Sequence, residues 1–158
     1  MTERVQRLRD AFDLSFVEAP SVGRERGAVA LALRIGDDPY ALPLAPHVTM
    51  VTKAPRIVAL PGGAAHQLGV AGVRGTLAIV VSLPELLGYT RTDASWLAMV
   101  AGAKDVALAF DRIEGQIDLA GHALSAATTT GGRRHIAGVV GTSPPRALID
   151  IPSILERL

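Results

Sequence analysis

The sequence contains no cysteine among its 158 residues. This absence excludes disulfide bonds, zinc sites with cysteine ligands, iron–sulfur clusters and catalysis by a thiol, so the fold must be stabilised by packing. The chain also lacks an excess of either charge, because 16 lysines and arginines face 15 aspartates and glutamates. A net charge of +1 supplies no field that gathers nucleic acid or an anionic membrane. We therefore expect no nucleic-acid partner.

Aromatic residues and long apolar runs are scarce too. Trp96, Tyr40 and Tyr89 do not form the interleaved basic and aromatic strip of a barrel that binds single-stranded nucleic acid. The longest uncharged run, residues 57–73, is interrupted by Pro61 and by several glycines, and it predicts no membrane insertion. The N-terminus, MTERVQRLRDAFDL, is too charged for a signal peptide. A cytoplasmic protein is the simplest interpretation.

The spacing of apolar residues predicts two regions. Four large apolar residues near the N-terminus recur at intervals of three and four, which predicts an amphipathic helix that ends before Pro20. These residues are Val5, Leu8, Phe12 and Phe16. A polar, glycine-bounded stretch follows, so residues 1–26 are predicted to form a helix and a linker, and residues 27–158 one folded domain.

From residue 28 the apolar period changes from 3.6 to 2. Val29, Leu31, Leu33 and Ile35 alternate with alanines and Arg34, which predicts a half-buried strand. Further short apolar runs between prolines and glycines predict strands at residues 40–44, 48–51, 57–60, 67–73, 76–83, 96–100, 106–110, 113–119, 135–140 and 147–151. Helical tracts are confined to 84–87 and to the C-terminus from Pro152, and 124–134 is predicted to be a loop. This pattern predicts an all-β barrel or pair of barrels.

No catalytic constellation is evident in the sequence. The four histidines, His47, His66, His122 and His135, lack the spacing of a zinc helix or knuckle, and we interpret each as a surface or loop residue. No serine lies in a G-x-S-x-G elbow. We expect no enzyme activity, cofactor or metal. The alternative is a small hydrolase or ligand-binding barrel that uses His66, His122 or His135. A pocket in which two of them lie within hydrogen-bond reach of each other or of a carboxylate would favour it.

Two glycine-rich segments are compared with phosphate-binding loops, and one of them is a candidate. Gly131-Gly132-Arg133-Arg134 combines flexible backbone with two guanidinium groups, although loop solubility explains it more simply. The glycines of residues 69–75 match neither a Walker nor a Rossmann pattern. They are better explained by a close strand crossing and a tight turn.

Five short motifs, in order along the chain, resemble those of the CheW family. They are Tyr40-Ala41-Leu42-Pro43, Leu60-Pro61-Gly62, Leu68-Gly69-Val70, Arg74-Gly75 and Leu86-Leu87-Gly88. The stretches LRIGDDPYALPL, WLAMVAGAKDVALAFDRIEGQIDL and ALIDIPSILERL add to the likeness, which covers about residues 31–158. Each motif is weak by itself, but their common order makes a specific signal.

The resemblance implies a fold of two intertwined five-stranded SH3-like β-barrels with short N- and C-terminal helices. It also implies a non-catalytic adaptor, one face of which binds the regulatory domain of a CheA-type histidine kinase. A groove between the barrels takes the cytoplasmic tip of a methyl-accepting chemoreceptor, and other CheW-like proteins are further candidate partners.

For the receptor-binding groove, the resemblance points to Val48, Met50, Arg74 and Gly75. Arg74 is the main candidate because its planar guanidinium can bridge carboxylates or carbonyls of a receptor helix. Alternatively, Arg74 closes a turn within its own domain. Val48 and Met50 offer an apolar seat for the receptor, or they belong to the core.

Five positions depart from the family pattern. Gly72 stands in place of Asn, Ile79 of Pro, Ser82 of Asp, Pro84 of Arg and Thr49 of Glu. We expect these positions to lie on the surface, where the loss of polar groups would weaken kinase coupling. The alternative function is therefore a diverged scaffold that binds receptors or other CheW-like domains without coupling to the kinase.

Overall fold

The computed structural model describes residues 28–102, 105–126 and 134–158. The predicted N-terminal helix and linker, residues 1–26, and most of the predicted loop at 124–134 lie outside the described residues. No helix within the described ranges is long and apolar enough to cross a membrane.

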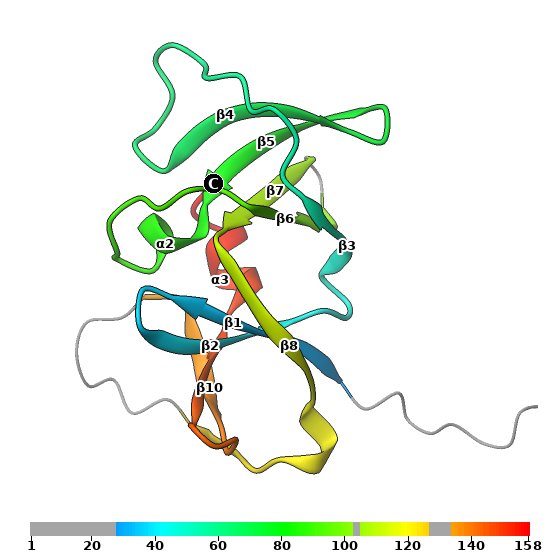
Figure 1. Ribbon diagram of the computed structural model, residues 1–158, viewed down its shortest axis with the longest axis vertical. Helices are drawn as coiled ribbons and strands as arrows, with labels where there is room; N and C mark the ends of the chain where they lie inside the picture. Colours follow the sequence, from blue (N-terminus) through cyan, green and yellow to red (C-terminus); the bar gives the residue numbers. More distant parts are fainter. Residues whose placement is uncertain (1–27, 103–104, 127–133) are drawn as a thin grey trace, which may run out of the picture.

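Two β-sheets make up most of the described structure (Figure 1). The elements in chain order are β1 (Val29–Ile35), β2 (Asp38–Pro43), β3 (Val48–Lys53), β4 (Gln67–Val73), β5 (Thr76–Ser82), α2 (Leu83–Leu86), β6 (Trp96–Val100), β7 (Val106–Phe110), β8 (Arg112–Asp118), the 3₁₀ turn η1 (Leu119–Gly121), β9 (Leu124–Ala126), β10 (Ile136–Val140), β11 (Arg146–Ile149) and α3 (Ile151–Leu155). One sheet has the order β8-β1-β2-β11-β10-β9, and the other has the order β3-β6-β7-β5-β4.

The chain passes twice between the two sheets, which confirms the predicted all-β, intertwined architecture. It begins in the six-stranded sheet with β1 and β2, builds the five-stranded sheet with β3 to β7, and returns for β8 to β11. The six-stranded sheet has one strand more than expected. Residues 124–126, predicted to be part of a loop, form β9 because their backbone pairs with β10.

The predicted strand at 57–60 is wrong. Only Val58 pairs with a strand, through two 2.8 Å hydrogen bonds with the backbone of Val70. Pro55 and Pro61 flank this segment, and proline removes the N–H donors that a longer ladder would need.

Strand β1 is buried on both faces, whereas the sequence predicted a half-buried strand. Leu31, Leu33 and Ile35 pack into the main core, but Ala30 and Ala32 on the opposite face are buried as well. Residues of β2, β8, β10 and η1 cover that face. The alternation of large apolar residues with alanine in β1 therefore separates two apolar clusters, one on each face of the strand. It does not separate a buried face from a solvent-exposed face.

The main core lies between the two sheets and joins them. It combines residues of β1 and β2 with Val81 of β5 and Leu108 of β7. Helix α3 contributes Ile151 and Ile154, both fully buried, and it lies between the sheets (Figure 1). Burial of two such side chains contributes about 3–6 kcal/mol, so the C-terminus stabilises the junction of the sheets.

A pair of tyrosines, Tyr40 buried and Tyr89 half-buried, connects β2 to the segment after α2. The Tyr40 and Tyr89 hydroxyls lie 2.7 Å apart, their rings pack edge to face, and Tyr89 donates a hydrogen bond to Asp38. Burial raises the pKa of the Tyr89 hydroxyl well above its usual range, and the bonds to Asp38 and Tyr40 raise it further. Tyr40, the first residue of the Tyr-x-Leu-Pro motif, thus connects the two halves of the molecule.

Candidate functional site

The turn between β4 and β5 consists of Arg74 and Gly75. Val73 pairs directly with Thr76, so the hairpin has a two-residue loop. Both loop residues have positive φ, 48° at Arg74 and 82° at Gly75, as in a type I′ turn. For a residue other than glycine this backbone costs about 1–2 kcal/mol.

The Arg74 side chain makes no contact with the described residues that would compensate this cost. It is exposed, and no hydrogen bond or ion pair joins it to any residue that the structure describes. The backbone pairing alone closes the turn, which disfavours the alternative role of Arg74 as a turn-closing side chain. Unrelieved strain of this kind is concentrated at functional positions.

Gly69, in the Leu-Gly-Val motif, permits a close approach of two backbone segments. Its φ is +141°, and a Cβ atom here would lie 2.0 Å from the carbonyl oxygen of Val58. Gly69 thus serves a close strand crossing and Gly75 a tight turn, as the sequence predicted for this segment, whereas Gly72 serves neither.

One face of the β4–β5 hairpin exposes apolar side chains. Leu77 is 66% exposed and Val58 55% exposed. The pairing of Val58 with Val70, and of Val70 with Ile79, places these side chains on the same face as Leu77. We call this group (Val58, Val70, Leu77, Ile79) the hairpin face. Within the hairpin face, Ile79 packs against the main core, whereas Leu77 does not. The hairpin face is therefore an outward continuation of that core.

The structure separates the predicted receptor groove into two parts. Val48 follows the crossover from β2 to β3, is half-buried and packs against the main core, so it borders the junction of the sheets. Met50 packs into the separate core of the five-stranded sheet. β3 and β4 are the two ends of that strand order, but Met50 of β3 packs in the same core as Ala71 and Val73 of β4. Arg74 and Gly75 lie at the far tip of the hairpin, away from the six-stranded sheet (Figure 1).

Two of the departures from the family pattern are buried, which corrects the expectation that all five lie on the surface. Ser82 is 1% exposed, and its Oγ accepts a hydrogen bond from the Glu85 N–H at the start of α2. Serine and aspartate are equally good helix N-caps, so the replacement keeps the cap. Pro84 lies in the first turn of α2, where proline fits. Gly72 and Thr49 are exposed.

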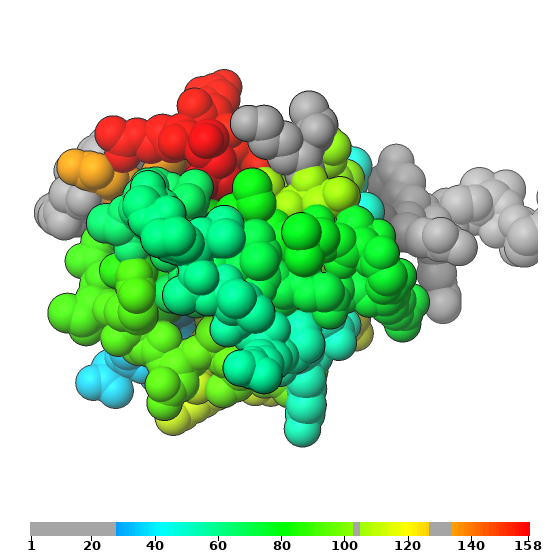
Figure 2. Space-filling view, turned by 90° about the horizontal axis from the view of Figure 1, so that it is seen from above, coloured from blue at the N-terminus to red at the C-terminus, as the bar shows by residue number. Residues whose placement is uncertain are grey.

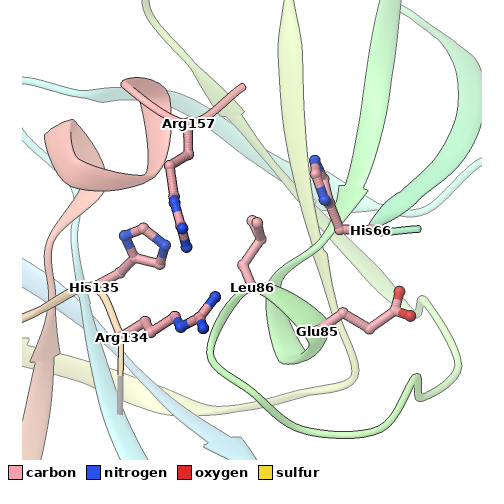
Figure 3. Close-up of a pocket in the computed structure, with 6 residues that line it drawn as sticks. All are labelled: His66, Glu85, Leu86, Arg134, His135 and Arg157. Carbon is pink, nitrogen blue, oxygen red and sulfur yellow. The ribbon is translucent and has the colours of Figure 1, made fainter. Parts of the chain in front are cut away.

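His66 and His135 line one cavity of about 280 Å³, with Glu85, Leu86, Arg134 and Arg157 (Figure 3). His135 is half-buried, with its Nδ1 atom 2.7 Å from the Ser153 hydroxyl. The hydrolase or ligand-binding alternative named both histidines, but their meeting with Ser153 was not predicted, because residues 66, 135 and 153 are far apart in the sequence.

This cavity does not contain a catalytic triad. In the described ranges no histidine hydrogen-bonds another histidine or a carboxylate, and no three metal-ligating side chains form a group. The Asp150 carboxylate accepts a hydrogen bond from the Ser153 N–H as the cap of α3, so it does not orient the imidazole. A triad needs a carboxylate on the histidine, and the hydrolase alternative therefore lacks support here.

Comparisons with known proteins complete this description. The family model of the CheW-like domain matches residues 30–158. Among solved structures, the chain is similar to the scaffolding protein TtCheW from Thermoanaerobacter tengcongensis, with a TM-score of 0.66 and 17% sequence identity. That match covers 78% of this chain and 88% of the other. A comparison with curated protein sequences finds no match. The structural likeness establishes the fold, and the family match over nearly the whole described region establishes that the chain belongs to the CheW-like domain family.

Proposed function

We propose that this protein is a non-catalytic adaptor in a cytoplasmic chemosensory array, where it links the tips of chemoreceptors to a CheA-type histidine kinase. Membership of the CheW-like family over residues 30–158 supports the general role. The observation that carries the binding function is Arg74, because its guanidinium is exposed and unpaired among the described residues on a strained backbone. This position favours asparagine or glycine, and a contact of the guanidinium beyond the described residues, here with a binding partner, explains why it holds arginine.

Two surfaces supply the contacts in this proposal. Arg74 and Gly75 present a cation beside the hairpin face, where a receptor helix finds apolar side chains and a planar donor. Val48 offers a half-buried apolar contact at the junction of the sheets, and Met50 supports it from within the five-stranded core. Either the receptor tip contacts both surfaces, or one surface binds the receptor and the other binds the kinase.

The alternative function is a scaffold that binds receptors or other CheW-like domains without coupling to the kinase. Two of the departures that suggested this alternative no longer support it, because Ser82 and Pro84 form the start of α2 and are buried. The exposed departures, Thr49 and Gly72, still favour it. The coupler remains our main proposal, since the residues at Ser82 and Pro84 preserve local structure.

Reconstitution with purified components tests the two functions. A receptor tip fragment and a CheA-type kinase from the same host are mixed with the full chain, and both binding and kinase autophosphorylation are measured. Stimulated autophosphorylation supports the coupler, whereas receptor binding without stimulation supports the scaffold. Binding of neither partner would overturn both.

A further inference from the structure

A second site of interest lies at the C-terminal end of the chain, away from the Arg74 turn. Two adjoining cavities of about 280 and 580 Å³ share Arg134, His135 and Arg157 as lining residues. The chain end lies at the surface near the segment that precedes β4 (Figure 2). His66 and Leu86 complete the smaller cavity from the side of the five-stranded sheet. Segments from both halves of the molecule therefore build the site.

The cavity holds two positive charges that the described part of the chain does not neutralise. The guanidinium groups of Arg134 and Arg157 point into the space beside Leu86, while the Glu85 carboxylate points away from them (Figure 3). Glu85 is instead paired with Arg91 at 3.0 Å. Neither Arg134 nor Arg157 has a carboxylate within ion-pair distance among the described residues, although Glu156 borders the larger cavity.

His135 is held in a fixed orientation between these two arginines. Its backbone has a φ of 59°, a strained value for a residue with a side chain, and its carbonyl accepts a hydrogen bond from the Asp150 N–H. The Ser153 hydroxyl bonds to Nδ1, and Nε2 has no partner in the described ranges. Burial lowers the pKa of His135, the charges of Arg157 and Arg134 lower it further, and Asp150 partly opposes them.

We infer that this cavity binds a phosphate group, either as free phosphate or on a small phosphomonoester. Two planar guanidinium forks suit the oxygens of one phosphate dianion, and the free imidazole nitrogen adds a third polar contact. The volume is near the lower limit for small-molecule sites, about 300–1,000 Å³, which suits a small ligand. Leu86 provides an apolar wall for the carbon skeleton of an ester. Arg134 is the last residue of Gly131-Gly132-Arg133-Arg134, whose composition made it a candidate for phosphate binding.

Calorimetric titration of the full chain tests this inference. Inorganic phosphate is the first probe and glycerol 3-phosphate the second, both at constant ionic strength. We expect saturable binding that Arg134→Gln or Arg157→Gln weakens at least about tenfold. Arg112→Gln is the matched control, because the Arg112 side chain is also exposed and has no hydrogen-bond or ion-pair partner among the described residues, but lies on β8. It should leave the affinity unchanged.

The measured affinities distinguish free phosphate from a phosphomonoester as the ligand, and they also show whether the site binds phosphate at all. Equal affinity for both probes indicates free phosphate, and tighter binding of the ester indicates a phosphomonoester that uses Leu86. Binding of neither probe, or equal weakening by all three variants, would overturn the site. NMR titration of the unmodified chain gives an independent readout: phosphate should raise the pKa of His135. An unaffected His135 would also overturn it.

Discussion

Substitution of Arg74 by asparagine separates the strain of the turn from the function of the side chain. Arg74 has a φ of 48°, which costs a residue other than glycine about 1–2 kcal/mol. Asparagine tolerates this region, and Asn-Gly is a favoured pair for a type I′ turn. We therefore expect the free energy of unfolding to rise by about 0.5–1.5 kcal/mol. For a chain of 158 residues, each kcal/mol raises the melting temperature by about 2–4 °C.

Binding should change in the opposite direction. A charge-assisted hydrogen bond contributes about 1.5–3 kcal/mol, so its loss weakens partner affinity at least about tenfold. Titrations of the receptor fragment and of the kinase regulatory domain are measured separately, because they identify which partner uses Arg74. Arg74→Lys keeps the charge and the strain but loses the planar fork, so we expect intermediate affinity and an unchanged melting temperature.

Two results would refute this reasoning. A lower melting temperature for Arg74→Asn would mean that the arginine side chain stabilises the turn. Full affinity for both partners in a well-folded Arg74→Asn protein would remove Arg74 from the binding surface. The proposed function would then lose the residue that carries it, while the fold assignment would stand.

Three further substitutions test the fold. Gly69→Ala should lower the free energy of unfolding by more than about 2 kcal/mol, because the added Cβ collides with the Val58 backbone; chemical denaturation measures this. Gly72→Ala, where a Cβ meets no atom within 4 Å, should stabilise the strand by about 0.5–1 kcal/mol, and a loss instead would contradict the assigned geometry. Arg34, with Arg146, holds the pKa of Glu114 below its usual value of 4.5, so this carboxylate contributes stability above that pH and loses it as the pH falls through the lowered pKa. Glu114→Gln should remove that part of the acid dependence of the melting temperature.

The sequence predicted the elements whose apolar period is long and whose ends are marked by proline or glycine. Residues 96–100 and 106–110 match β6 and β7, and residues 67–73 match β4. The predictions for two short segments were wrong. Val58 lies in an apolar run of the sequence but forms only one isolated β-bridge, and residues 124–126 pair with β10 although their composition indicates a loop. Both outcomes depend on a partner strand distant in sequence, which local pattern does not contain.

The candidate sites were less predictable than the fold. The Arg-Gly motif predicted the turn at residues 74 and 75. It did not predict that the guanidinium lacks a partner among the described residues, because that depends on where other side chains of the sheet lie. The cavity of His66, His135 and Arg157 was missed, because three distant segments meet only after β10 and α3 close on the five-stranded sheet. A signal was present in Gly-Gly-Arg-Arg, whose last residue lines that cavity.

The buried departure at Ser82 gives a last prediction, which separates a change in the fold from a change in the binding surface. Ser82→Ala removes the N-cap of α2 and should lower the free energy of unfolding by about 1 kcal/mol. Because Ser82 is 1% exposed, partner affinity should stay unchanged at temperatures where the protein is folded. Thr49→Ala, at an exposed position, should change stability by less than about 0.5 kcal/mol. Loss of kinase binding by folded Ser82→Ala protein would instead place the start of α2 in the kinase contact.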